Sequence, residues 1–164
     1  MEIIGLGLGS NLGDRADMLR KAIGLIGNLA FENICLSKVY ETEPWGFVTE
    51  NAFLNMVLTA QTTFSPSQIL EEIIRIEQIL GRVRVENQYS DRPIDLDILF
   101  YGYQSFKDSQ LEIPHPRMHT RRFVLEPLRD INPMWQHPIT GVFIEELIEQ
   151  CTDNPLTCFG EIRF

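Results

Sequence analysis

The sequence predicts an α+β fold of the ferredoxin-like type, a two-layer sandwich in which helices pack on a mainly antiparallel sheet. Two observations lead to this prediction. Segments with strand and helix periodicity alternate in the order β-α-β-β-α-β, with the helices expected on one face, and no internal repeat or linker interrupts them. The 164 residues, 44% of them hydrophobic, are enough for one core, so residues 1–164 are expected to form a single domain.

Strands are predicted where short apolar runs alternate with polar residues or end at turn residues. The first run ends at Gly9 and is followed by a tight turn into a helix. In the last long strand, Ile94, Leu96, Ile98 and Phe100 are expected to face the core together. The predicted strands are residues 2–9, 33–41, 52–62 and 93–101, with a short hairpin at 103–113.

Helices are predicted by apolar residues spaced along one face and by capping residues at the ends. Asp14 is expected to open the first helix. Ser65 and Gln68 have the spacing of a capping box at the start of the second, and Gly81 is a suitable terminator. The expected helices are residues 14–29, 65–81, 120–129 with Thr120 as cap, and 143–150.

Composition narrows the class of protein. The net charge of −9 argues against non-specific nucleic-acid binding, which needs a basic surface. No stretch approaches the roughly 20 apolar residues that span a membrane. The three cysteines are odd in number and lack metal-ligand spacing, and the first residues do not resemble a signal peptide. The cytoplasm is therefore the expected compartment.

The sequence Asp95-Leu96-Asp97 is the most informative tripeptide. In a strand, both carboxylates point to the same face, roughly 6–7 Å apart. They repel each other unless a cation lies between them, and hard oxygen ligands suit Mg²⁺ together with substrate phosphates. Taken alone, this pattern is also typical of an exposed polar strand face.

Arginine residues flank this strand. Of the 14 Lys and Arg residues, seven lie between Arg82 and Arg122, and six of these are Arg. Phosphoryl transfer needs metal and guanidinium groups around charged phosphates, so the combination favours an enzyme that transfers a phosphate-containing group. The aromatic loop 42–47 and Phe53 with Asn55 would suit a flat heterocycle in a second pocket. Taken alone, these residues are more typical of loop packing and of a polar group at the end of a sheet.

Together these segments resemble the 6-hydroxymethyl-7,8-dihydropterin pyrophosphokinases of folate biosynthesis. The resemblance extends from about residue 3 to 130, and the spacing of Gly81-Arg82-Val83-Arg84 ahead of Arg92-Pro93-Ile94-Asp95-Leu96-Asp97-Ile98 is its most specific part. The other matching segments are Gly9-Ser10-Asn11-Leu12, Tyr40 to Gly46, Phe53-Leu54-Asn55, Glu77, Pro114 to Met118 and Arg121-Arg122-Phe123.

The resemblance implies transfer of pyrophosphate from ATP to the hydroxymethyl group of the pterin by a monomeric enzyme. It implies that Asp95 and Asp97 hold two Mg²⁺ ions and that Arg82 and Arg92 join them as catalytic residues. The nucleotide-binding residues it implies are Glu77, Arg84, Arg92, Ile98, His115 and Arg121, and the pterin-binding residues are Thr42, Trp45, Phe53, Asn55 and Phe123. The sequence departs from the common pattern at Glu43, Trp45, Phe53, Tyr89 and Pro116.

Two alternatives remain open at this point. A nucleotidyl transferase or cyclase also pairs Asp residues on a ferredoxin-like sheet with two metals, and it would release free pyrophosphate. A non-catalytic regulatory module of the same fold would bind a small ligand without turnover, since one fold hosts many functions.

Overall fold

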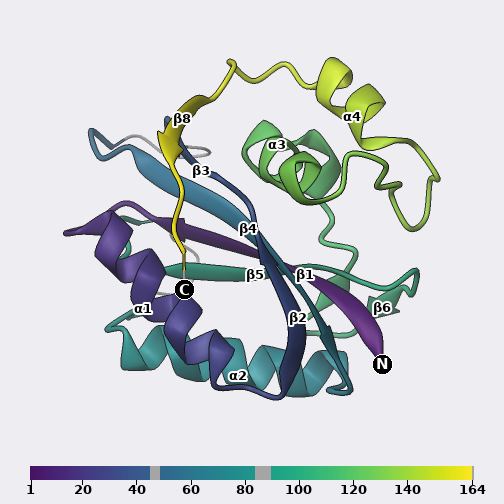
Figure 1. Cartoon of the computed structure of the whole chain (residues 1–164), viewed down its shortest axis with the longest axis horizontal. Coiled ribbons are helices and arrows are strands. Elements are labelled where there is room, and N and C mark those ends of the chain that lie inside the picture. Colours follow the sequence, from purple (N-terminus) through teal and green to yellow (C-terminus); the bar gives the residue numbers. More distant parts are fainter. Residues whose placement is uncertain (45–48, 84–89, 164) are drawn as a thin grey trace.

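The computed structural model describes residues 1–44, 49–83 and 90–163. Its main sheet has the strand order β5-β1-β4-β3-β8, and β2 pairs with β4 beside β3 (Figure 1). All of these pairs are antiparallel. The strands are β1 (Glu2–Ser10), β2 (Phe31–Leu36), β3 (Val39–Thr42), β4 (Phe53–Thr62), β5 (Asp95–Tyr101) and β8 (Thr157–Gly160), and β6 (Phe106–Lys107) and β7 (Glu112–Ile113) form a separate hairpin.

Two helices, α1 (Arg15–Gly27) and α2 (Pro66–Ile79), cover one face of the sheet (Figure 1). The predicted capping box of α2 is present, because Ser65 and Gln68 each accept a hydrogen bond from the other's backbone N–H. Asp14 caps α1 by accepting a hydrogen bond from the backbone N–H of Asp17 at 3.0 Å. Their apolar stripes pack on the strands in the larger of two buried clusters, which includes Ile4, Leu6, Leu8, Ile23, Ile26, Ile69, Ile73, Leu96 and Ile98.

The prediction that the helices cover one face is incomplete. On the opposite face, α3 (Arg122–Ile131) and α4 (Ile144–Gln150) pack over Val57, Leu99 and Phe100 of the sheet (Figure 1). These apolar side chains are buried only if a second layer of helices packs on that face of the sheet. The ferredoxin-like arrangement of a mainly antiparallel sheet with packed helices is otherwise confirmed.

One residue of β5 does not face where the alternation predicts. Leu6 pairs with Ile98 and Gly5 with Phe100, so one residue more is present on β5 than on β1 at this point. This β-bulge turns Leu99 and Phe100 to the same face, and Phe100 joins the cluster under α3. The prediction that Phe100 faces the same side as Leu96 was therefore wrong.

The predicted strand 33–41 is two strands, β2 and β3, which pair with successive halves of β4. Between them, the buried Ser37 accepts a hydrogen bond from the Val57 backbone N–H at 2.9 Å.

The prediction that Thr120 caps α3 was wrong, because Thr120 lies in a 3-10 helix (Met118–Thr120) ahead of that helix. Its hydroxyl donates to the Arg117 carbonyl instead, at 3.1 Å.

The C-terminal residues reach both faces of the sheet. After α4, strand β8 pairs with β3 at the edge opposite β5. Ile162 then packs in the cluster of α1 and α2. The tail thus closes the β3 edge of the sheet.

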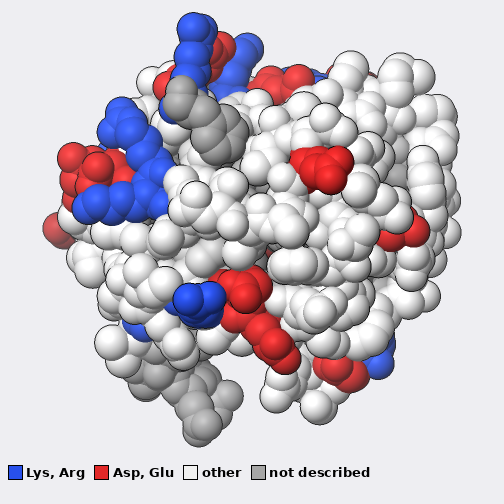
Figure 2. Space-filling view, turned by 60° about the horizontal axis from the view of Figure 1, so that its bottom comes forward, with Lys and Arg blue, Asp and Glu red and all other residues white. Residues whose placement is uncertain are grey.

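No helix among the described residues is long and apolar enough to cross a membrane. On the face drawn in Figure 2, Lys and Arg side chains form small groups beside acidic ones and make no continuous basic stripe.

Candidate functional site

A cavity of about 440 Å³ lies on the α3 face of the sheet, where the helices leave the strands uncovered. Strand β5 contributes Asp95 and Asp97 to it, as the alternation with Leu96 and Ile98 predicts. Strand β4 contributes Phe53 and Asn55, and the start of α3 brings Phe123. Segments distant in sequence therefore meet at the two predicted carboxylates.

The floor of the cavity is the glycine side of β1. Gly5, Gly7 and Gly9 alternate with the core residues of that strand, and Gly7 and Gly9 line the cavity. A Cβ atom at position 9 would come within 2.8 Å of the Asn55 Oδ1 atom. The sequence prediction placed Gly5 and Gly7 in the first strand and Gly9 at its closing turn without giving them a role in the site, although a glycine at every second strand position is a signal of close approach.

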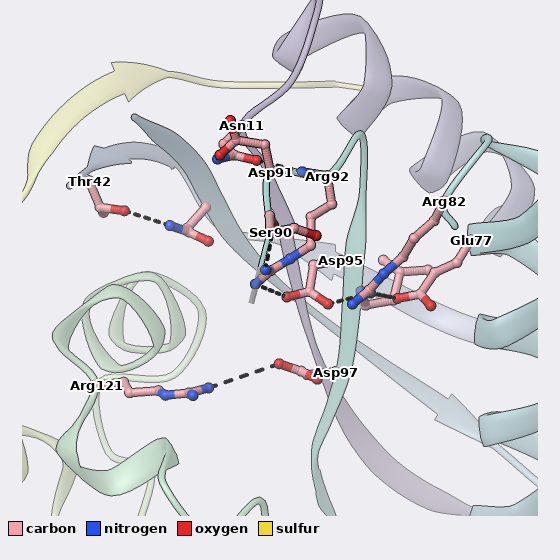
Figure 3. A network of polar contacts seen from close by, with 12 residues as sticks. Asn11, Thr42, Glu77, Arg82, Ser90, Asp91, Arg92, Asp95, Asp97 and Arg121 are labelled. Atoms are coloured by element: carbon pink, nitrogen blue, oxygen red, sulfur yellow. Dashed lines mark hydrogen bonds and ion pairs between the residues drawn. The ribbon is translucent and has the colours of Figure 1, made fainter. Parts of the chain in front are cut away.

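Asp95 is held between two arginines (Figure 3). Its Oδ2 atom accepts from Arg92 Nη2 at 2.7 Å, and its Oδ1 atom accepts from Arg82 Nη1. Burial alone would raise the pKa of Asp95, but the two guanidinium groups lower it below its usual value. Asp95 is therefore an ionised carboxylate at neutral pH.

Glu77 supports this arrangement from below the cavity. Its buried carboxylate accepts from Arg82 Nη1 and, at 2.8 Å, from the backbone N–H of Leu96. It thereby joins α2 to the start of β5 and to Arg82. A buried carboxylate is stable in such a position because these groups donate hydrogen bonds to it.

Asp97 lies two residues further along the same strand face. It forms an ion pair with Arg121, whose Nη1 atom is 4.0 Å from Asp97 Oδ2 (Figure 3). Although 43% of the Asp97 side chain is accessible through the cavity mouth, the surrounding protein and the Asp95 carboxylate raise its pKa to about 7. The neighbouring charges thus disfavour a second negative charge here unless a cation is added.

These carboxylates fit a hard divalent cation. Both present oxygen ligands to one cavity, and burial together with the Asp95 carboxylate raises the pKa of Asp97. Over residues 1–44, 49–83 and 90–163, no group of three or more His, Cys, Asp or Glu side chains could hold a metal. Mg²⁺ matches such a site, since it is commonly bound by one or two carboxylates with substrate phosphates and water.

His115 adds a neutral donor to the charged side of the cavity. Burial and the nearby Arg121 and Arg117 lower the pKa of His115 to about 4. Its Nδ1 atom accepts from the Arg117 backbone N–H at 3.1 Å, which assigns the remaining proton to Nε2. The ring can therefore donate one hydrogen bond without carrying a charge.

The other end of the cavity is aromatic. Asn55 Nδ2 donates to Thr42 Oγ1 at 2.7 Å, which fixes the orientation of the amide. The Arg92 guanidinium lies 5.1 Å from the Phe53 ring centre and that of Arg121 lies 5.4 Å from the Phe123 ring centre. Each arginine thus spans the aromatic and the anionic parts of the site.

The structure brings most of the predicted site residues together. Two of them do not line the cavity: Glu77 lies beneath Arg82, and the Ile98 side chain packs in the core of the other face. Trp45 and Arg84 lie outside the described residues. Those that line the cavity are Thr42, Phe53, Asn55, Arg82, Arg92, Asp95, Asp97, His115, Arg121 and Phe123.

Comparison with known proteins points to one family. Residues 5–133 match the family described as 7,8-dihydro-6-hydroxymethylpterin-pyrophosphokinase. The 2-amino-4-hydroxy-6-hydroxymethyldihydropteridine pyrophosphokinase of Porphyromonas gingivalis is 44% identical over 141 residues, 84% of this chain and 95% of that protein. The protein of the same name from Aquifex aeolicus is 38% identical over 163 residues, 99% of this chain and 100% of that protein.

Solved structures show the same fold. Wild-type HPPK-DHPS of Plasmodium falciparum aligns with a TM-score of 0.73 over 91% of this chain, at 18% identity. This chain spans only 44% of that longer protein. At this level of identity, the likeness concerns the fold alone.

Proposed function

This chain belongs to the 7,8-dihydro-6-hydroxymethylpterin-pyrophosphokinase family, a pyrophosphokinase family of folate biosynthesis, and we propose how its residues carry out the transfer. The enzymes of this family use ATP and generally require Mg²⁺. The reaction proposed for this chain joins the pyrophosphoryl group of ATP to the hydroxymethyl group of 6-hydroxymethyl-7,8-dihydropterin. The hydroxyl oxygen bonds to the β-phosphorus, the bond from that phosphorus to the α-phosphate oxygen breaks, and AMP leaves as the hydroxyl proton is released.

One observation carries the assignment of residues: Asp95 and Asp97 share a cavity whose described lining includes Arg82, Arg92, Arg117 and Arg121. The carboxylates are proposed to hold two Mg²⁺ ions together with the triphosphate. When bound, these ions would supply the positive charge that neutralises the phosphates. The number of ions is part of the proposal.

The charged residues are proposed to bind and orient the triphosphate. Arg82 and Arg92 are proposed as the catalytic arginines, because each contacts Asp95 and lines the cavity. Arg121 and the neutral His115 would donate to the same phosphates from the α3 side. Arg84, which lies outside the described residues, keeps the nucleotide-binding role expected from the sequence.

Glu77 is proposed to act on the nucleotide indirectly, by holding other groups in place. Ile98 is proposed to contact the nucleotide through its backbone. Glu77 holds Arg82 and the N–H of Leu96 at the outer edge of β5. Because backbone N–H groups two residues apart in a strand point the same way, the Ile98 N–H is directed to that edge as well. The purine of ATP would then lie along the edge of β5 rather than against the Ile98 side chain.

The aromatic end is proposed to take the pterin. Phe53 and Phe123 offer ring faces, and the Asn55 amide, oriented by Thr42, leaves its Oδ1 atom to accept from an amino group of the ring. Trp45 keeps its predicted place in this pocket, outside the described residues. Held in this way, the hydroxymethyl group would face the carboxylates. The mechanism relies on positioning and charge neutralisation rather than on a strong protein base.

The test is to incubate the protein with ATP, Mg²⁺ and the reduced hydroxymethylpterin, and to separate the products. We expect AMP and the pterin diphosphate, with no turnover when a chelator removes the metal. ADP would identify a simple phosphotransferase, and free pyrophosphate would identify a nucleotidyl transferase or cyclase. Either product would contradict the proposal. A monomeric state and a place in the cytoplasm remain further predictions from the sequence.

A further inference from the structure

Asp91 lies at the rim of the site and connects three segments that surround it (Figure 3). Its Oδ1 atom accepts from Asn11 Nδ2 at 2.7 Å. Its Oδ2 atom accepts from Thr49 Oγ1 at 3.1 Å and from Asn51 Nδ2. With three donors divided between its two oxygens, the carboxylate has one defined orientation.

Asn11 connects the Asp91 carboxylate to the backbone of Arg92 through hydrogen bonds. The buried Asn11 amide donates to Asp91 and to the Asn51 carbonyl, and its Oδ1 atom accepts from the Arg92 backbone N–H at 2.8 Å. The Arg92 carbonyl in turn accepts from the Asn11 backbone N–H at 3.3 Å. The backbone of Arg92 is thus fixed by hydrogen bonds on both its donor and its acceptor group.

The Arg92 guanidinium depends on this backbone position. It must reach Asp95 at 2.7 Å while lying over Phe53, so a small shift of the backbone breaks one contact or the other. The Arg92 Nε atom is buried and has no hydrogen-bond partner among the described residues, and Nη1 donates to the Ser90 carbonyl at 3.0 Å, two residues earlier in the same loop. Asp91 itself does not line the cavity, whereas its neighbours Ser90 and Arg92 do.

We infer that Asp91 is a positioning residue for the pyrophosphoryl transfer, which acts through Asn11 to keep Arg92 between Asp95 and the pterin pocket. This inference rests on the proposed function. A carboxylate suits this position because all three neighbouring side chains donate to it, and an ionised carboxylate accepts from all of them. Burial would raise the pKa of Asp91, but the hydrogen bonds from Asn51, Thr49 and Asn11 lower it, so the group is ionised at neutral pH.

The test measures turnover in Asp91→Ala and in the same substitution made on an Arg92→Ala background. We expect Asp91→Ala to lower kcat by about 10- to 100-fold, the usual result of misplacing a catalytic group by a small distance. In the Arg92→Ala background it should lower kcat no further, because the residue through which it acts is already gone. Asp91→Asn, which keeps the size and one acceptor oxygen, should retain an intermediate kcat.

A matched control is Asp108→Ala. Asp108 also accepts two hydrogen bonds in an exposed turn, from the backbone N–H groups of Gln110 and Leu111 at 2.7 and 2.8 Å, but lies in the β6–β7 hairpin away from the cavity. Its replacement should leave kcat within about twofold of wild type while costing similar stability. If Asp91→Ala does not fold, the same comparison is made with Asp91→Asn. Its kcat relative to the parent protein is then measured in the wild-type and in the Arg92→Ala backgrounds.

An unchanged kcat in Asp91→Ala, or an equal further loss in the Arg92→Ala background, would overturn the inference. The proposed function is judged separately by whether the wild-type protein forms AMP and the pterin diphosphate in the same assay. A failure of the Asp91 inference alone would leave wild-type turnover intact and change only the ratios between variants.

Discussion

The two faces of the sheet serve different purposes, and strand β5 contributes to both. On the α1 and α2 face, Leu96 and Ile98 are buried in a continuous apolar cluster. On the α3 face, the helices cover only part of the sheet, and Asp95 and Asp97 line the open cavity. Substitutions of adjacent residues in this strand should therefore differ in effect: those of Leu96 and Ile98 should lower stability, and those of Asp95 and Asp97 should lower turnover.

The largest separation is expected for Asp97→Asn. The substitution removes a charge proposed to bind metal, so kcat should fall by at least about 1000-fold while the fold is retained. Measuring AMP formation together with the far-UV circular dichroism spectrum checks both parts. Near-normal turnover in a folded variant would exclude Asp97 as a metal ligand.

The same variant should also change how stability depends on pH. The pKa of Asp97 is raised from 3.8 to about 7 by burial and by Asp95, so the folded protein binds this proton more tightly than the unfolded chain does. Without metal, wild-type stability should therefore contain a contribution that is lost as pH rises from about 4 to 7. Thermal unfolding in a chelator at several pH values should show a smaller loss for Asp97→Asn, and an equal loss would contradict this assignment.

The opposite behaviour is expected for Leu6→Ala on the other face. Leu6 is fully buried beneath α1 and α2, and its truncation should lower the free energy of unfolding by about 2–5 kcal/mol. Turnover per folded molecule should stay within about twofold, since the side chain points away from the cavity. Denaturant unfolding and active-site titration would measure the two quantities. A large loss of kcat in the folded fraction would show that the faces are coupled.

Much of the α1 and α2 face was predictable because its signals are local. The capping box at Ser65 and Gln68, the cap at Asp14 and the alternation of Leu96 with Asp97 each lie within a few residues of one another. The same local alternation correctly predicted that both aspartates face one side. The grouping of arginines with aspartates was predictable only from the combination of motifs.

The α3 face was less predictable because the contacts that form it join residues distant in sequence, or because a β-bulge interrupts the alternation of side chains along the strand. The bulge that turns Phe100 depends on its pairing with Gly5, nearly a hundred positions earlier. The opening of α3 depends on Asp153, not on the neighbouring Thr120. The link from Asp91 to Asn11 likewise joins two loops that no local pattern connects.

Gly5 and Gly7 lie on the same side of β1 but differ in the space available for a Cβ atom. A Cβ atom at Gly5 would lie 2.2 Å from Phe100 Cε1, whereas one at Gly7 would meet Leu99 Cδ2 at an ordinary 3.4 Å. Gly5→Ala should therefore lower the free energy of unfolding by about 1–3 kcal/mol, and Gly7→Ala by less than about 1 kcal/mol. Denaturant unfolding of the two variants provides the measurement, each serving as control for the other. Equal costs would show that Phe100 can move aside.

The smallest effect concerns the tail, through the start of α3. Asp153 Oδ2 accepts from the Arg122 backbone N–H at 3.2 Å, and the Arg122 side chain donates to the Ile148 carbonyl at 3.2 Å. The tail therefore caps the helix that begins beside Arg121 and contains Phe123. Asp153→Ala should lower the free energy of unfolding by about 1 kcal/mol, as the loss of a helix cap usually does.

Because Arg121 and Phe123 lie at that end of α3, Asp153→Ala should also raise the KM for the pterin more than it lowers kcat. Asp153→Asn, which keeps a capping oxygen, should restore most of both effects. Glu161→Ala, which removes an exposed ion pair with Arg163 from the same tail, is the control and should change neither. A shift in kcat without a shift in KM would instead indicate that the tail acts on the carboxylate end of the cavity, and would remove the distinction between its aromatic and anionic parts.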